Sequence, residues 1–402
     1  MYEWSKSVPS GMKDYLFGDA AKRRRLEGDI SEVLECRGYH EVITPVLEFY
    51  DVFSECAGAF KQEDMYKMFD ADGRILVLRH DMTTPIARVV TTKLKDAFYP
   101  LKFYYKQSVV RSNGAFRGKR DEVAQCGAEL IGEEGVRADL EIIASAIESM
   151  RACVKDSFRI ELGHIGFYEA AAQQLAGYNC DLDGIRDGLA DNDFAALDEL
   201  LKGLPPDNTG VKMIKSLPRL FGDISVLEKA REISNDCADG VIDKLELLYY
   251  MLKELGYDKY ISFDLGVVHN INYYTGLVFR GYVEGAGDAC LNGGRYDRLM
   301  ERFGPQMPAV GFAVNLDSVA ETAQGTNCDL SPDIVIHYDD GCERRAYELL
   351  KKYAAQGLIC EISVFDSPEK SYKYAVKRNT RQRFIHISEK EEIVTDMEVK
   401  SL

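Results

Sequence analysis

The sequence has no run of apolar residues that approaches the roughly 18 needed for a membrane span. Its first residues, MYEWSKSVPSGMKDYLFGD, also lack the apolar core of a signal peptide. The ten cysteines are scattered singly, with no Cys-x-x-Cys pair, which argues against a zinc site and against a disulfide framework. We therefore expect a cytoplasmic protein with reduced thiols, no membrane segment, no metal and no cofactor.

Basic residues are in deficit. Lysine and arginine number 50 against 66 aspartates and glutamates, which gives a net charge of −16. Such a surface repels phosphate backbones unless basic side chains gather in a patch, and the two candidate patches are 111–120 and 373–383. Charged runs of this kind are usually solvated faces, and we interpret Lys373, Lys377 and Arg378 in this way. We do not expect nucleic-acid binding.

With 402 residues, the chain is long enough for two or three domains. The pattern over 1–321 predicts an α+β core, with a mixed, mainly antiparallel sheet flanked by helices and an almost wholly helical insertion at about 168–255. The stretch 322–332 reads as a linker. Strand-like and helix-like runs then alternate over 333–402, which predicts a small α/β domain.

Local signals place the elements of the core. Asp72-Gly73 predicts a hairpin turn between two short strands, at 65–70 and 75–79. Thr83 or Thr84 is expected to cap a helix. His164 is expected to do no more than end a strand. Further strands are predicted at 101–110, 123–131 and 157–163, and 309–321 is predicted to be a strand running into a helix. Further helices are predicted at 19–37, 50–57, 137–153, 343–356 and 367–378.

The stretch Ile261–Glu301 is rich in Val, Ile, Phe, Tyr and Gly. It predicts two long strands, 261–268 and 273–284, then a glycine-rich turn at 285–294 and a helix that opens near Tyr296. Its aromatic pair and its Asn-Gly-Gly-Arg-Tyr-Asp run suggest a wall where backbone comes close to a small ligand. The alternative is an ordinary buried hairpin.

Five ordered stretches resemble the core of class II aminoacyl-tRNA synthetases, and specifically of histidyl-tRNA synthetase. GYHEVITPVLE resembles motif 1, YYKQSVVRSNGAFRGKRDEVAQCGAELIG motif 2, and AVGFAVNLDSVAE motif 3. LRHDMTTPIAR resembles the LRPE-x-T segment, and VVHNINYYTGLVF with NGGRYDRL resembles the two histidine-recognition motifs. The resemblance covers about residues 5–321 and implies the class II fold. Residues 333–402 resemble a shortened anticodon-binding domain.

The departures from the synthetase pattern concern the groups that handle ATP. His269 and Ser318 stand where the family has arginines, while the arginine of motif 2 survives as Arg111. Asn272 and Asn113 replace acidic residues of the pattern. Because adenylation develops charge on the α-phosphate, and because the loss of one such contact costs about 10²–10³ in rate, these swaps argue against an active synthetase.

The amino-acid pocket of the pattern is retained. The resemblance places Glu129 and Tyr273 against an imidazole, and Asp81 near an α-amino group. Glu129 also stands out on its own, since a carboxylate on an apolar strand needs a partner, either an internal one such as Arg111 or a ligand. The implied histidine-binding residues are Asp81, Thr83, Arg111, Gln125, Glu129, Tyr273 and Tyr274, with Gly294 on a wall.

A synthetase core that keeps this pocket and loses the adenylation arginines resembles the regulatory subunits of ATP phosphoribosyltransferase. The resemblance implies a non-catalytic protein in the first step of histidine biosynthesis, with a short-form catalytic subunit as partner and L-histidine as feedback ligand. It also implies a homodimer formed through the core, for which 38–48 is the candidate contact. Two alternatives stay open: an active histidyl-tRNA synthetase using ATP, Mg²⁺ and tRNA, or a histidine-binding regulatory module with another partner.

Overall fold

The structure is a computed structural model that describes residues 4–54, 62–113, 119–190, 193–267, 274–323 and 330–397. The chain divides into two compact units, the first made of residues 1–16 and 20–326 and the second of residues 17–19 and 327–402. Within the described ranges, no helix is both long enough and apolar enough to cross a membrane.

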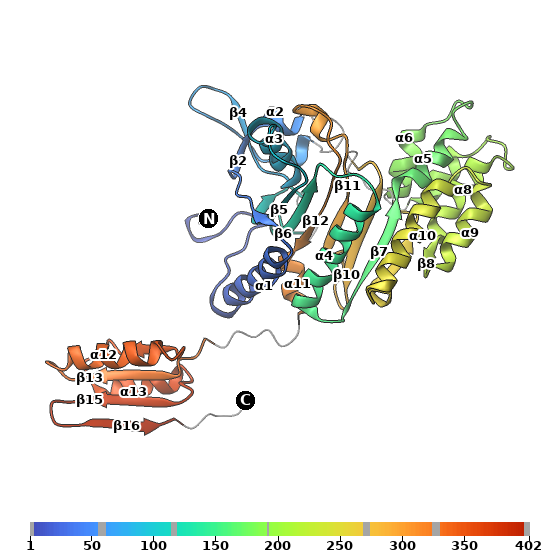
Figure 1. Cartoon of the computed structure of the whole chain (residues 1–402). Helices are drawn as coiled ribbons and strands as arrows, with labels where there is room; N and C mark the ends of the chain where they lie inside the picture. The colour runs from blue at the N-terminus through green and yellow to red at the C-terminus, as the bar shows by residue number, and fades with distance from the viewer. Residues whose placement is uncertain are drawn as a thin grey trace. The chain divides into compact units, whose positions relative to one another are not determined.

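A nine-stranded mixed sheet forms the centre of the first unit (Figure 1). Its neighbouring strands are antiparallel except at β1–β5 and β7–β9, which are parallel. The predicted fold class is confirmed. In sheet order the strands are β1 (His40–Glu41), β5 (Leu101–Val110), β6 (Glu122–Ile131), β12 (Ala309–Asn315), β11 (Leu291–Arg295), β10 (Leu277–Val283), β7 (Phe158–His164), β9 (Ile261–Asp264) and β8 (Phe221–Gly222).

Different helices cover the two faces of this sheet. Alternate side chains of a strand point to opposite faces, so Ala128 and Leu130 of β6 pack in one core cluster while Tyr105 of β5 packs with Ile86 in another. Glu129, which lies between Ala128 and Leu130, therefore faces the side of Ile86. The first cluster is covered by α1 (Phe17–Cys36), α4 (Val136–Val154) and α11 (Leu316–Thr322), and the second by α3 (Thr83–Lys93).

A small three-stranded sheet is formed by residues that precede α3 in the chain, and it contains the predicted hairpin. Its strands β2 (Leu47–Phe49), β4 (Ile75–Leu78) and β3 (Lys67–Phe69) are antiparallel and lie in the order β2-β4-β3. Helix α2 (Tyr50–Ser54) confirms the start of the helix predicted at 50–57, and the rest of that prediction lies outside the described residues.

The cap of α3 was wrongly predicted. Neither Thr83 nor Thr84 caps the helix; instead the Asp81 carboxylate accepts from the Thr84 backbone N–H at 3.0 Å and from the Thr84 hydroxyl at 3.1 Å. An aspartate three residues ahead of a free helical N–H makes a stronger acceptor than a threonine hydroxyl inside the first turn. The capping residue is therefore also a candidate pocket residue.

The helical pattern of the insertion corresponds to a bundle of helices that follows β7 (Figure 1). Its buried residues, such as Met213, Leu227 and Ile242, belong to the same cluster as the covered face of the sheet. The short strand β8 inside it was not predicted and pairs with β9. The helices are α5 (Ile165–Gln173), α6 (Leu182–Ala190), α7 (Phe194–Leu200), α8 (Thr209–Ser216), α9 (Ser225–Ser234) and α10 (Asp239–Glu254).

The stretch 261–301 differs from its prediction in three ways. The strands β9 and β10 are shorter than predicted, and they are separated by β7, which pairs in parallel with β9 and antiparallel with β10. The first part of the predicted glycine-rich turn, 285–290, does connect β10 to β11, but residues 291–295 form strand β11, which is paired on both sides. No α-helix opens at Tyr296; only a single 3₁₀ turn follows, at Met300–Arg302.

The second unit is a small α/β fold with strand order β14-β13-β15-β16. Its first three strands are parallel and are crossed by two helices on opposite faces, as the alternating pattern predicts. The antiparallel edge strand β16 was not predicted. The elements are β13 (Ile334–Tyr338), α12 (Glu343–Ala354), β14 (Cys360–Ile362), α13 (Pro368–Lys377), β15 (Arg383–Ile387) and β16 (Glu392–Asp396).

Candidate functional site

A cavity of about 190 Å³ opens on the α3 side of the large sheet, at the centre of strands β5, β6, β12 and β11. The structure brings together six of the seven predicted pocket residues here, with Gly294, which was assigned to a wall. The seventh, Tyr273, lies outside the described residues. The lining is Asp81, Met82, Thr83, Tyr105, Arg111, Gln125, Glu129, Tyr274, Asn292, Gly294, Tyr296, Gly311, Phe312 and Ala313.

Glu129 is the buried acid of this cavity, with 1% of its surface exposed. Its Oε1 accepts from the Thr83 hydroxyl at 2.9 Å, and its Oε2 accepts from the Tyr296 hydroxyl at 2.5 Å. Burial raises the pKa of Glu129 from 4.5 to about 8, although both hydroxyl donors lower it. Among the described residues, Glu129 forms no ion pair, so a basic group entering the cavity would find an uncompensated acid.

Two glycines keep the cavity open. Gly294 of β11 and Gly311 of β12 are register partners on adjacent strands. A Cβ on Gly311 would lie 1.7 Å from Glu129 Oε2, and a Cβ on Gly294 would lie 2.6 Å from the Tyr274 ring. Any side chain at either position therefore displaces a residue of the pocket.

Asp81 sits at the entrance to α3 and is buried. Each of its oxygens accepts one hydrogen bond from Thr84, through the backbone N–H and the hydroxyl. The same turn presents Thr83 to Glu129. The α3 cap thus fixes an acid and a hydroxyl at one end of the cavity.

Arg111 is not the partner of Glu129. Its Nε donates to the His80 carbonyl at 2.9 Å, which holds the guanidinium at the mouth of the cavity. Arg111 and Gln125, together with Asn292 and Ala313, also line a second cavity of about 980 Å³. The two cavities share this wall.

The larger cavity contains the positions where the synthetase pattern holds nucleotide. Ser318 and Asn113 both line it. The Asn315 side chain caps α11 by accepting from the Ser318 backbone N–H, and the Asn113 amide donates to the Arg120 carbonyl at 2.7 Å. Neither residue supplies a charge to the cavity.

Acidic side chains on the same wall neutralise much of its basic charge. Lys119 pairs with Asp288 at 2.7 Å, and Arg120 pairs with Glu321 at 2.7 Å. The described lining holds four basic side chains, Arg111, Lys119, Arg120 and Arg280, against three acidic ones, Asp288, Asp317 and Glu321. A triphosphate would meet a nearly neutral wall with carboxylates facing it.

A buried ion triad lies behind the glycine strand. Arg295 donates to Asp139 at 2.7 Å and to Asp297 at 3.1 Å, with 8% of its side chain exposed. It also contacts backbone carbonyls at the start of α4. The triad ties β11 to α4 and fixes the strand on which Gly294 lies.

Several residues that line the cavity were not predicted from the sequence. Tyr296 donates to Glu129 but was assigned to a helix start, and Tyr105, Asn292 and Gly311 received no role. The Asn-Gly-Gly-Arg-Tyr-Asp run would have pointed to Tyr296 if it had been interpreted as a strand followed directly by this tyrosine. His164 does end β7, and its Nδ1 also accepts from the Gly166 N–H at 3.0 Å, which caps α5. His269 and Asn272 lie outside the described residues.

Comparison with known proteins identifies the family model and the relatives that this chain matches. The family model described as histidyl-tRNA synthetase matches residues 11–319. The ATP phosphoribosyltransferase regulatory subunit of Clostridium botulinum (strain Langeland / NCTC 10281 / Type F) is 38% identical over 384 residues, which is 94% of this chain and 91% of the relative. The protein of the same name from Bacillus cereus (strain AH820) is 34% identical and covers 100% of this chain and 93% of the relative.

Solved structures agree on the fold. A crystal structure of an ATP phosphoribosyltransferase regulatory subunit/histidyl-tRNA synthetase from Bacillus halodurans C has a TM-score of 0.85 at 28% identity, and the match covers 96% of this chain and 99% of the other. Histidyl-tRNA synthetase from Nostoc sp. PCC 7120 has a TM-score of 0.79 at 20% identity, which shows the shared fold alone.

Proposed function

The chain belongs to the family of ATP phosphoribosyltransferase regulatory subunits, and from that premise we propose that it is a non-catalytic subunit through which L-histidine regulates a catalytic partner. Its place is the first step of histidine biosynthesis. The observation that carries the ligand assignment is Glu129, a buried acid with no charged partner among the described residues, at the centre of a small cavity.

The cavity suits one amino acid with an imidazole side chain. At about 190 Å³ it lies below the roughly 300–1,000 Å³ of ligand pockets for larger molecules. The Glu129 carboxylate would accept an imidazole N–H, with Thr83 and Tyr296 holding its oxygens in place. Asp81 would pair with the α-ammonium group. Arg111 is the one cationic side chain in the described lining of the cavity, and it would pair with the ligand's carboxylate.

The balance of charge in the larger cavity argues against the synthetase alternative. Adenylation needs fixed cations around the α-phosphate, whereas two of the four basic side chains here, Lys119 and Arg120, are paired with acids and Ser318 is neutral. In the second unit, Arg378, Arg381 and Arg383 likewise pair with carboxylates, which weakens the case for tRNA binding.

A second copy of the chain is the proposed partner of the motif 1 segment, 38–48. This segment contains β1, the edge strand of the large sheet, and exposes Ile43, Val46 and Leu47, with Ile43 75% exposed. An edge strand flanked by exposed apolar residues is an unsatisfied surface unless another chain covers it. The homodimer would form here.

The catalytic partner is proposed to be a short-form ATP phosphoribosyltransferase, in a cytoplasmic hetero-oligomer. Feedback requires that L-histidine favour one arrangement of this assembly, because a ligand that binds two states equally shifts neither. The affinity of the small cavity for L-histidine would differ between those states, and the wall that it shares with the larger cavity would change its arrangement.

Calorimetry with L-histidine tests the pocket directly. We expect one site per chain and a loss of roughly 10–100-fold in affinity for Glu129→Gln, because a hydrogen bond to a charged group contributes about 1.5–3 kcal/mol. Glu134→Gln, an exposed neighbour at the start of α4, is the matched control. Equal affinity in wild type and Glu129→Gln would show that the ligand binds elsewhere.

Two further assays separate the alternatives. Robust pyrophosphate exchange driven by histidine and ATP would identify an active synthetase and overturn the regulatory proposal. Mixing with a short-form catalytic subunit should give co-elution and phosphoribosyl transfer that histidine inhibits. Histidine binding without co-elution and without transfer would point to a regulatory module with another partner.

A further inference from the structure

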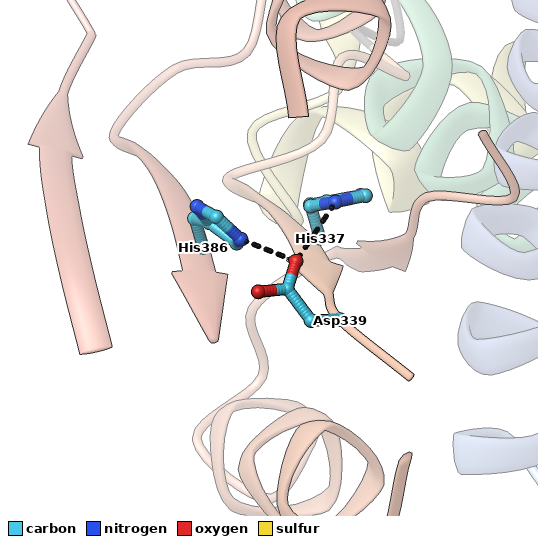
Figure 2. A group of neighbouring side chains, drawn as sticks. All are labelled: His337, Asp339 and His386. Atoms are coloured by element: carbon cyan, nitrogen blue, oxygen red, sulfur yellow. Dashed lines mark hydrogen bonds and ion pairs between the residues drawn. The ribbon is translucent and has the colours of Figure 1, made fainter. Parts of the chain in front are cut away.

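Three side chains of the second unit meet at the carboxyl end of its parallel strands. His337 of β13 and His386 of β15 are register partners, so both rings project from the same face of the sheet. Asp339 follows β13, and Figure 2 shows both rings directed toward its carboxylate. Asp339 Oδ1 lies 2.8 Å from His386 Nε2 and 3.7 Å from His337 Nε2. One ligand atom from each residue lies within 4.8 Å of the others.

The position of His337 is unusual for a sheet core. Val335 and Phe384 on the same face pack against α13, and an apolar residue at 337 would extend that cluster. Instead, His337 is 2% exposed and its Nδ1 contacts the Ser371 hydroxyl at 2.9 Å. Ser371 in turn contacts the Ser363 hydroxyl at 2.6 Å. This buried polar chain orients the ring and leaves Nε2 pointing at Asp339.

We propose that His337, Asp339 and His386 bind one divalent transition-metal ion, with Zn²⁺ the best-suited class. Two imidazole nitrogens and one carboxylate oxygen form a donor set that zinc uses when it keeps a fourth position open. The Ser371 hydroxyl can accept from Nδ1–H, which is the kind of outer-shell contact that orients a ligating histidine. The ion would take the place of the hydrogen bond between Asp339 Oδ1 and His386 Nε2.

The spacing fits after small movements. Zinc bonds to nitrogen and oxygen are about 2 Å long, so ligand atoms on one ion lie roughly 3–4 Å apart. His386 and Asp339 are half-buried and can rotate to reach this spacing, whereas His337 is held by Ser371. Asp339 also borders a cavity of about 790 Å³, which supplies the open side. That side is where a water molecule would reach the ion.

The sequence prediction of no metal rested on the cysteines. Their spacing argues against cysteine-based zinc sites, but it says nothing about ligands drawn from two strands that are neighbours only in the sheet. His337 and His386 are 49 positions apart in the chain yet pair directly across it. The proposed site is independent of the histidine pocket, which lies in the other unit.

Cobalt titration of the full chain tests the site. The protein, without a histidine tag and stripped by a chelator, is titrated with Co²⁺ at pH 7.5 and then with Zn²⁺, in the absence of histidine. We expect one Co²⁺ per chain, with visible d–d absorption, no thiolate-to-cobalt charge transfer, and displacement by Zn²⁺. The missing charge-transfer band distinguishes this site from the exposed thiols of Cys36 and Cys237.

Variants then assign the ligands. His386→Gln and Asp339→Asn should each weaken binding by at least about tenfold, and Ser371→Ala should weaken it by about tenfold through its effect on His337. His40→Gln, which removes an exposed histidine of the first unit, is the control and should bind like wild type. Equal binding by all variants, or no stoichiometric binding by wild type, would overturn the proposal.

One measurement on wild type alone covers the possibility that a variant does not fold. The ring resonances of His337 and His386 should shift together when one equivalent of Zn²⁺ is added, while those of His40 stay unchanged. Shifts confined to other histidines would place the ion elsewhere and overturn the assignment.

Discussion

Glu129→Gln should change how the stability of the first unit depends on pH. The carboxyl group of Glu129 is fully enclosed, and burial raises its pKa from 4.5 to about 8. Glutamine has nearly the same shape but no charge. The hydroxyls of Thr83 and Tyr296 can reverse their donor and acceptor roles to suit its amide. The substitution therefore removes the titration with little change in packing.

The sign follows from the raised pKa. In the folded protein Glu129 holds its proton up to about pH 8, whereas in the unfolded chain it loses the proton near 4.5. The folded state binds more protons between these values, so wild-type stability falls as pH rises from 4.5 to 8. Each pH unit costs about 1.4 kcal/mol, and the whole interval corresponds to roughly 5 kcal/mol.

Urea unfolding of both proteins from pH 5 to pH 9 measures this effect. The stability of Glu129→Gln minus that of wild type should be near zero at pH 5, rise through pH 7, and level off above pH 8. Taking the difference cancels the titration of other groups. Glu134→Gln, an exposed glutamate, should give a flat difference. A flat difference for Glu129→Gln as well would refute the burial of an uncompensated acid.

Three other predictions follow from the same contacts. Gly311→Ala should abolish histidine binding in calorimetry and cost about 1–3 kcal/mol in urea unfolding, because its Cβ would lie 1.7 Å from Glu129 Oε2. Unchanged binding would show that the ligand does not bind beside Gly311. Arg295→Met should cost about 1–3 kcal/mol, because it leaves the partly buried Asp139 without its cationic partner, and adding Asp139→Asn should recover part of that loss. A loss under about 1 kcal/mol would contradict the triad. Ile43→Glu should shift sedimentation from dimer to monomer, and a persistent dimer would move the contact elsewhere.

The local parts of the fold were predictable because their signals are local. Asp72-Gly73 between two apolar runs is a sufficient hairpin signal, and β3 and β4 formed as expected. The strands β5 and β6 also pair as neighbours in the chain. In each case, turn chemistry and strand pattern act within a few residues of one another.

The strand order around β7 could not be read in the same way. β9 and β10 are consecutive strand runs, which suggests direct pairing, yet β7 lies between them, although the bundle of helices separates β7 from both in the chain. The choice depends on which faces the bundle covers, and that is a tertiary property. The glycines of β11 misled for a related reason, since they serve close packing around the pocket and not a turn.

The candidate site was predictable where a residue conflicts with its surroundings. A glutamate between Ala128 and Leu130 on an apolar strand conflicts with burial, and it proved to be the buried acid of the cavity. Tyr296 carries no such conflict, since a tyrosine in a core is ordinary. The cluster at His337 was missed because its partner is adjacent only through the register of two parallel strands.

The paired glycines of β11 and β12 also limit the substitutions that the large sheet can accept. Gly294 and Gly311 face each other across one ladder, and a methyl group at either position fills the space beside Glu129 or Tyr274. Each glycine also packs against the sheet itself, since a Cβ on Gly311 would lie 2.7 Å from the Ala128 carbonyl oxygen and a Cβ on Gly294 would lie 2.8 Å from the Leu277 carbonyl oxygen. Neither position therefore accepts a side chain without a shift of the backbone, even in a chain whose pocket binds nothing.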